Sequence, residues 1–141
     1  MRIIGFNLLK ILIERKENFE GELKIDQNID IKDIIKEKVP ISTDEALRVK
    51  FKFVIDYSKN SAKLEFEGFV ILLPEKEELK EFLDSWKDKK IPEKSKIPLF
   101  NFIMTKCNVK ALSLEDDLAL PTHIPMPRLN PEDTKENKSP K

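Results

Sequence analysis

The residues best suited to chemistry in this chain are a single histidine, His123, and a single cysteine, Cys107. These two ligands cannot complete a structural zinc site within one chain, and their spacing of sixteen residues matches no zinc-ligand pattern. A Cys–His nucleophilic pair is also disfavoured, because Cys107 falls on the apolar stripe of a predicted helix, where a thiolate is costly. We therefore expect Cys107 to pack in the core, and His123 to lie at the surface or to bond a local carbonyl group.

Carboxylates offer the other route to chemistry. The densest cluster, Glu115-Asp116-Asp117, lacks the ligand spacing of a calcium loop and is more typical of an exposed turn after a helix. No phosphate-binding, dinucleotide-binding or nucleophile-elbow motif occurs, and the chain has three glycines in all. These observations predict no enzyme, no cofactor and no metal site, although a small hydrolase that uses unrecognised carboxylates stays open as an alternative.

The charge balance argues against nucleic acid as a partner. The 26 basic residues equal the 26 acidic ones, so the formal net charge is zero. The densest basic segment, residues 87–96, also contains acidic residues and has no interleaved aromatic residues for base stacking, which is typical of a solvated connection. At 37%, charged residues exceed the roughly 25% of an average domain and resemble the surface of a thermophilic protein.

No apolar run in the sequence is long enough to span a membrane, since the best candidates are residues 68–74 and 97–105. The apolar segment 3–13 is interrupted by Lys10 and followed by charged residues, whereas a signal peptide would have small residues there. The single cysteine fits a reducing compartment. We expect a cytoplasmic protein without a membrane span.

Two runs of alternating apolar residues predict a β-hairpin over residues 45–73. A turn at Lys59-Asn60 would pair Phe53 with Phe66, so that apolar side chains meet on one face. This hairpin is the strongest structural signal in the chain and predicts the centre of an antiparallel sheet.

Beyond Gly68, which this register sets opposite Phe51, the second face of the hairpin becomes apolar as well. Phe69, Ile71 and Leu73 all fall on that outer face. They require cover from the chain's own helices, from another subunit or from a ligand. The excess of apolar surface therefore predicts a binding role.

The segments before the hairpin are less regular. Residues 3–15 predict a first strand, and the alternation at residues 19–25 predicts a second. Residues 29–39 fit either a helix, because their isoleucines have helical spacing, or a short strand followed by a crossing loop. Pro40 ends this segment, and a capping-box hint at Ser42 is outweighed by the strand that follows.

The C-terminal half predicts two helices that pack on the sheet. Pro74 can occupy the first turn of one, and its apolar stripe consists of Leu79, Phe82, Leu83 and Trp86. The second runs from about Glu93 to Leu112 or beyond, with Pro98 in or near its first turn. Its stripe consists of Leu99, Phe100, Ile103, Met104, Cys107 and Ala111.

Residues 120–129 contain three prolines and predict an extended strap, which ends a single α+β domain over residues 1–129. Residues 130–141 predict a disordered tail. Burial of Leu120, Ile124, Met126 and Leu129 would stabilise the strap by about 1.5–3 kcal/mol each, which is comparable with the cost of ordering it. We expect the strap to cover the protein's own core; docking in an aromatic-lined groove of a partner is the alternative.

The order of one long strand, a variable crossing segment, a hairpin of two long strands and two helices resembles the SecB-type preprotein export chaperones. The segment ALRVKFKFVIDY at 46–57 and its return strand 62–73 carry most of the likeness, and NFIMTKC at 101–107 falls where the family's last long helix lies. The resemblance implies a four-stranded antiparallel sheet with helices on one face, assembly into dimers or tetramers, and apolar grooves that hold unfolded chains. The chain departs from the family in its neutral charge and in its strap.

We therefore expect a protein-binding module without catalytic activity that holds unfolded or partner polypeptides. The candidate contact residues are Phe69, Ile71, Leu73, Ile124 and Met126. The alternative is a structural or assembly subunit, most simply of a homo-oligomer, whose apolar face is permanently covered by a partner. Neither hypothesis requires nucleic acid, a metal or a cofactor.

Overall fold

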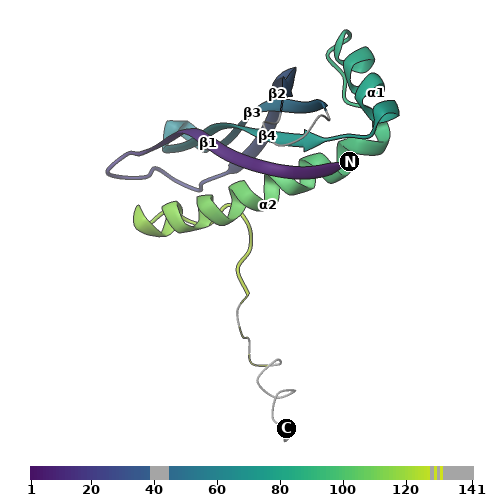
Figure 1. The fold of residues 1–141 in the computed structure, drawn as a ribbon. Helices are drawn as coiled ribbons and strands as arrows, with labels where there is room; N and C mark the ends of the chain where they lie inside the picture. Colours follow the sequence, from purple (N-terminus) through teal and green to yellow (C-terminus); the bar gives the residue numbers. More distant parts are fainter. Residues whose placement is uncertain (39–44, 128, 130, 132–141) are drawn as a thin grey trace, which may run out of the picture.

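The computed structural model describes residues 1–38, 45–127, 129 and 131. Within these residues, four strands form one antiparallel sheet in the order β1-β4-β3-β2, and two α-helices follow (Figure 1). The elements are β1 (Arg2–Arg15), β2 (Ile25–Lys38), β3 (Glu45–Tyr57), β4 (Ala62–Leu73), α1 (Lys76–Trp86) and α2 (Glu93–Asp117). This arrangement confirms the predicted α+β class. The expectations for Pro40, Ser42 and all of the tail except Pro131 lie outside the described residues.

The β3–β4 hairpin has the register that the sequence predicts. Phe53 pairs with Phe66, with ring centroids 6.0 Å apart, and Phe51 lies opposite Gly68. The turn between the strands is a short 3-10 helix, Ser58–Asn60. Because side chains alternate along each strand, the sheet has an inner face, which carries Phe51 and Phe53 toward the helices, and an outer face.

The prediction of a second strand at residues 19–25 is wrong, because β2 begins only at Ile25. β1 and β2 lie at opposite edges of the sheet, so the residues between them must cross its width and cannot pair within it. Hydrogen bonds hold both ends of the crossing: the backbone N–H of Lys16 donates to the Ser61 carbonyl oxygen at 2.8 Å, and the backbone N–H of Lys24 donates to the side-chain Oγ of Ser58 at 2.9 Å. The alternation in this segment therefore belongs to a crossing loop.

Both interpretations of the next segment, a helix or a short strand followed by a crossing loop, are also wrong. Within the described residues β2 is one long strand with a β-bulge, and it continues to Lys38. Its register with β3 shifts between Ile31 and Asp33, which leaves Lys32 without a partner residue. The extra residue lets both Ile31 and Ile34 face the inner side, opposite Phe51 and Val49 respectively. A bulge in a strand thus produces a spacing of three that imitates a helix.

α2 covers the inner face through residues spaced by four. Its buried residues are Ser95, Leu99, Ile103, Cys107, Ala111 and Glu115. α1 lies at the end of the sheet where β4 ends (Figure 1), with Phe82 fully buried and the rest of its predicted stripe partly buried. Pro74 precedes the helix cap, Glu75, and so lies outside the first turn, whereas Pro98 lies inside α2. Both helices join one core with the inner face of β3 and β4.

The strap joins this core only at its beginning. Leu120 is buried and Ile124 is half-buried, whereas Met126 is 52% exposed and Leu129 is 73% exposed. In Figure 1 the segment leaves the body on the side of α2 and runs away from the sheet. The expectation that the strap covers the protein's own core is therefore wrong beyond Ile124, because the backbone departs from the sheet after His123.

Candidate functional site

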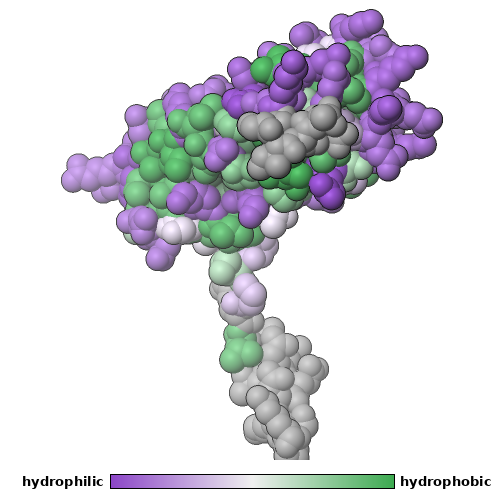
Figure 2. Space-filling model, viewed as in Figure 1, coloured by the Kyte–Doolittle hydropathy of each residue, from purple (hydrophilic) through white to green (hydrophobic). Residues whose placement is uncertain are grey.

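β1 is an edge strand that exposes large apolar side chains. It pairs with β4 along one side, and no other described strand pairs with its second side. Ile4 is 43% exposed, Leu9 67% and Ile11 45%. Figure 2 shows hydrophobic residues gathered along this side of the molecule, between hydrophilic ones. Free backbone groups beside apolar side chains make this edge a place where another extended chain can add.

Two β-bulges account for much of this exposure. The register of β1 with β4 shifts at Ile4 and again at Leu9, and neither residue has a partner in β4. The second bulge follows a position where β1 and β4 lie too close for a side chain, since a Cβ on Gly68 would lie 2.2 Å from the backbone oxygen of Asn7. Glycine at position 68 therefore permits the close pairing, and the extra residue that follows in β1 projects outward.

The centre of the outer face carries an ion-pair network. The carboxylate of Glu65 lies 2.7 Å from the Nζ of Lys10, 3.3 Å from that of Lys52 and 3.6 Å from that of Lys63. The hydrogen bond from Lys10 is the largest reason why the pKa of Glu65 falls to about 2. These contacts join β1, β3 and β4 across the sheet, so the middle of the outer face is polar and mutually satisfied.

The outer-face candidates lie together at one end of this face. Phe69 is buried beneath the guanidinium of Arg48, whose Cζ is 3.9 Å from the ring centroid, and Ile71 and Leu73 are half-buried. Ile71 pairs with Gly5 of β1, so this apolar end adjoins the exposed edge. A groove of about 840 Å³ opens beside it, lined by Met1, Arg2, Glu45, Leu73, Pro74, Glu75, Lys76 and Leu79.

The other two candidates, Ile124 and Met126, lie elsewhere. They follow α2, and Figure 1 places their segment on the helix side of the sheet. The five candidate residues therefore belong to two surfaces. Nothing in the sequence indicated this separation, because local patterns do not encode which face a C-terminal segment will cross.

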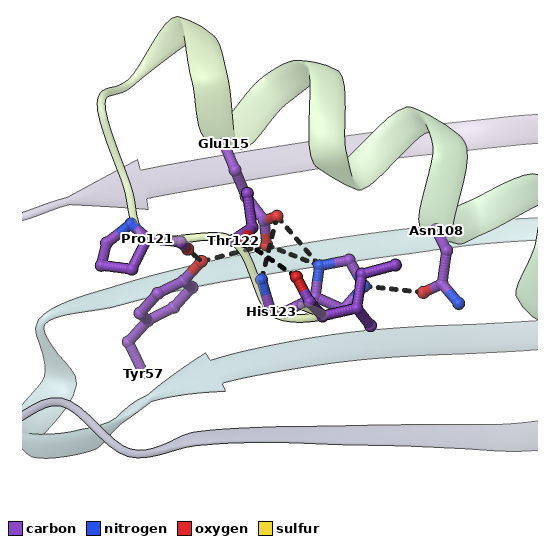
Figure 3. Close-up of polar contacts among 7 residues, drawn as sticks. Tyr57, Asn108, Glu115, Pro121, Thr122 and His123 are labelled. Carbon is purple, nitrogen blue, oxygen red and sulfur yellow. Dashed lines mark hydrogen bonds and ion pairs between the residues drawn. The ribbon is translucent and has the colours of Figure 1, made fainter. Parts of the chain in front are cut away.

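A buried polar cluster anchors the beginning of the strap (Figure 3). The carboxyl group of Glu115 lies 3.0 Å from the Tyr57 hydroxyl, and His123 Nδ1 lies 2.9 Å from both carboxyl oxygens. The backbone N–H of His123 donates to Glu115 Oε1 at 3.2 Å, and the ring Nε2 of His123 lies 2.7 Å from Asn108 Oδ1. The Tyr57 hydroxyl also contacts the backbone oxygen of Pro121. The cluster thus ties the strap to both α2 and β3.

This cluster corrects two expectations. The side chains of His123 and Glu115 are fully buried, so His123 is not a surface imidazole and Glu115 is not part of an exposed turn. Burial, together with the nearby Glu115, raises the pKa of Tyr57, which keeps its hydroxyl protonated. Every buried polar side-chain atom in the described part of the chain has a hydrogen-bond partner. The geometry therefore supports anchoring and leaves these side chains closed to a substrate.

One signal in the sequence does point to Glu115. The buried residues of α2 recur at every fourth position, and the stripe that includes Cys107 continues without interruption to Glu115. Tyr57 and His123 carry no comparable signal, since they meet only through the fold. Cys107 itself packs in the core as predicted, and burial raises the pKa of its thiol to about 12.

Among the residues that the structure describes, no three His, Cys, Asp or Glu side chains are grouped so as to hold a metal ion. No helix in the described ranges is long and apolar enough to cross a membrane.

Comparison with known proteins gives the fold at low sequence similarity. No family model matches the chain, and no curated protein matches it. Among solved structures it is similar to the Mycobacterium tuberculosis SecB-like chaperone Rv1957, which was solved in complex with a ChAD peptide from the Rv1956 HigA1 antitoxin. The TM-score is 0.51 at 17% identity, over 92% of this chain and 87% of that chain. The chain therefore has a SecB-like fold, which confirms the resemblance seen in its sequence.

Proposed function

We propose that this protein binds polypeptides as a SecB-like chaperone does, holding extended client segments on the β1 edge and the adjoining apolar end of the outer face. The observation that carries the proposal is the exposure of Ile4, Leu9 and Ile11 on a strand whose second side is unpaired within the described residues. The peptide bound to the similar mycobacterial chaperone supports a polypeptide as the partner.

The β1 edge offers two components of binding. Its backbone N–H and C=O groups can bond an extended chain of any sequence, and its apolar side chains favour segments that a folded client would bury. An unfolded polypeptide presents both. Burial of each exposed Ile or Leu side chain contributes about 1.5–3 kcal/mol before the cost of association, which suits a reversible complex.

The outer-face candidates extend the same surface. Asn7 of β1 pairs with Phe69, and Gly5 pairs with Ile71, so the apolar end of β4 lies one strand away from the edge. Alternate side chains of a client strand on β1 would face this side of the sheet. Contact of the client with Phe69, Ile71 and Leu73 is therefore part of the proposal.

An assembly subunit is the second candidate, because the same edge can pair with another copy. β1 is 14 residues long. Two such edges could join antiparallel in an isologous contact, in which the same surface of each subunit meets the other. Ile4, Leu9 and Ile11 would then be covered permanently and would hold no client.

Suppression of the aggregation of a denatured test protein, followed by light scattering, tests the proposal. We expect the wild-type protein to slow aggregation and to enhance the fluorescence of an apolar dye, and Leu9→Asp to lose most of both effects. Ile35→Asp is the matched control, since it places the same charge on an exposed site of the opposite edge strand.

Two results would decide against client binding. The first is a wild-type protein that neither slows aggregation nor binds the dye. The second is a stable, dye-silent dimer in sedimentation that dissociates in Leu9→Asp, which would establish the assembly subunit instead.

A further inference from the structure

The helix α2 runs beside the β1 edge on the inner side of the sheet (Figure 1). Two contacts fix this placement. At one end the rings of Phe6 and Phe102 meet edge to face, with centroids 6.0 Å apart. At the other end the guanidinium of Arg15 donates to the Leu118 carbonyl oxygen at 2.8 Å. The flank of α2 between Phe102 and Leu118 therefore follows the edge on which we propose that clients bind.

This flank of α2 carries two lysines. Phe102, Lys106 and Lys110 recur at every fourth position, each one residue before a buried residue of the helix, so all three lie on its β1 side. Phe102 is half-buried, whereas both lysines are exposed. The Nζ of Lys106 lies 5.8 Å from the Phe102 ring centroid. Neither lysine forms an ion pair with a residue that the structure describes.

The β1 side of the same surface is apolar. Ile11 pairs with Phe66, which is buried on the inner face, so the Ile11 side chain also lies on the helix side of the sheet. It is nevertheless 45% exposed. Phe6 and Leu8 lie on the same side and are half-buried. We call this surface the β1–α2 shelf; it is formed by Phe6, Leu8 and Ile11 of β1 and by Phe102, Lys106 and Lys110 of α2.

The charge on the β1–α2 shelf has one sign. Between residues 97 and 114, α2 contains Lys106 and Lys110 and no acidic residue. Glu65 and Glu67 belong to the outer face, where both form ion pairs with Lys10. The aspartates at 116–117 lie in the last turn of α2. An acidic side chain placed on the shelf would therefore meet two positive charges, whereas a basic one would be repelled.

The spacing of the two lysines matches that of an extended chain. From Lys106 to Lys110 the helix advances about 6 Å at roughly 1.5 Å per residue, and alternate residues of a strand lie about 7 Å apart at roughly 3.4 Å per residue. A client strand that adds to β1 directs every second side chain toward the shelf.

We propose that the β1–α2 shelf selects clients whose extended segments combine apolar residues with acidic residues two positions apart, which pair with Lys106 and Lys110. This inference rests on the proposed function, since it concerns the clients that the β1 edge holds. The apolar members of the shelf supply affinity for any unfolded segment, and the lysines supply the choice among such segments.

The size of the selection follows from the exposure of the lysines. An exposed ion pair raises an affinity about two- to five-fold, and repulsion between like charges lowers it by a similar factor. Two such sites should separate an acidic segment from a basic one on the order of ten-fold. Salt should weaken the selection, because the screening length falls from about 10 Å at 0.1 M to about 3 Å at 1 M.

Fluorescence anisotropy with labelled peptides tests the selection. The peptides share one apolar, extended sequence and carry Glu, Gln or Lys at two positions two residues apart. We expect the wild-type protein to bind the Glu peptide about ten-fold more tightly than the Lys peptide at low salt, with the Gln peptide between them. Near about 1 M salt the difference should shrink to less than about two-fold.

Variants of the two lysines locate the effect. Lys106→Glu/Lys110→Glu should reverse the order of the peptides, and Lys106→Gln/Lys110→Gln should remove the preference while it binds the Gln peptide as the wild type does. Lys80→Glu/Lys90→Glu is the matched control, because it changes the net charge equally at exposed sites in α1 and just after it. This control should keep the wild-type order.

Equal binding of the Glu and Lys peptides to the wild type would overturn this inference alone, and so would an unchanged order in Lys106→Glu/Lys110→Glu. A reversal in the control variant would also overturn it, because the selection would then come from net charge. Failure of all three peptides to bind would overturn it as well. The proposed function would fail with it only if the wild-type protein also left aggregation of the denatured test protein unaffected.

Discussion

At the Tyr57 end of the sheet, polar side chains are enclosed and bonded to one another, whereas along β1 large aliphatic side chains face water. A buried polar cluster is rigid once formed, because separating any of its groups from its hydrogen-bond partner costs free energy. An exposed apolar edge has no such constraint, and the free energy falls when another chain covers it. The cluster determines where the strap goes, and the edge is the surface on which we propose that clients bind.

Loss of Glu115 should produce the largest change. Glu115→Ala removes the acceptor that Tyr57 and His123 share inside the core, and we expect it to lower the free energy of unfolding by about 3 kcal/mol or more. Urea titration followed by circular dichroism measures the effect. Asp116→Ala, at the exposed neighbouring position, should stay within about 0.5 kcal/mol of the wild type. Similar losses in both variants would mean that the cluster does not stabilise the fold.

The close pairing at Gly68 should give the next largest effect. A Cβ at this position would lie 2.2 Å from the Asn7 backbone oxygen, so Gly68→Ala must shift β1, and we expect a loss of about 1–3 kcal/mol. Relative to the wild type, Gly68→Ala should speed amide hydrogen exchange in β1 more than in β3. Gly5→Ala is the control, since its Cβ would meet only the side chain of Ile71 at 3.3 Å. Unchanged exchange in β1 of Gly68→Ala would contradict this account of the bulge.

The Glu65 network should add a pH dependence of smaller size. The pKa of Glu65 is lowered from 4.5 to about 2 in the folded protein, so its ion pairs stabilise the fold above about pH 4.5 and are lost as the pH falls toward 2. Glu65→Gln should cost about 1 kcal/mol at neutral pH and flatten the decline of stability over that window. Unfolding titrations at several pH values check this. A decline in Glu65→Gln as steep as that of the wild type would assign it to other carboxylates.

Leu9→Asp should have the smallest effect on stability. Leu9 occupies a bulge and is mostly exposed, so we expect the free energy of unfolding of the Leu9→Asp variant to stay within about 0.5 kcal/mol of the wild-type value. The same variant should lose binding to a denatured client, whereas Glu115→Ala should retain it at temperatures where it is folded. If Leu9→Asp proved as destabilising as Glu115→Ala, the edge would belong to the core, and the contrast between the two regions would disappear.

Local patterns were sufficient for some elements and misleading for others. The register of Phe53 with Phe66 followed from strict alternation, and the burial of Cys107 followed from four-residue spacing. The spacing of Ile31 and Ile34 imitated a helix, because a bulge at Lys32 adds one residue to a strand. A single inserted residue thus defeats a periodicity argument, since it changes the face on which the following residues lie.

The sequence by itself determined the α+β class, the β3–β4 register and the side of α2 that is buried. These follow from the geometry of strands and helices, in which every second or every fourth residue shares a face. Only the tertiary structure decided that β1 lies at an edge, that the strap leaves the core, and that Tyr57, Glu115 and His123 meet. Those outcomes depend on contacts between segments far apart in the chain, and no local periodicity encodes the free energy of such contacts.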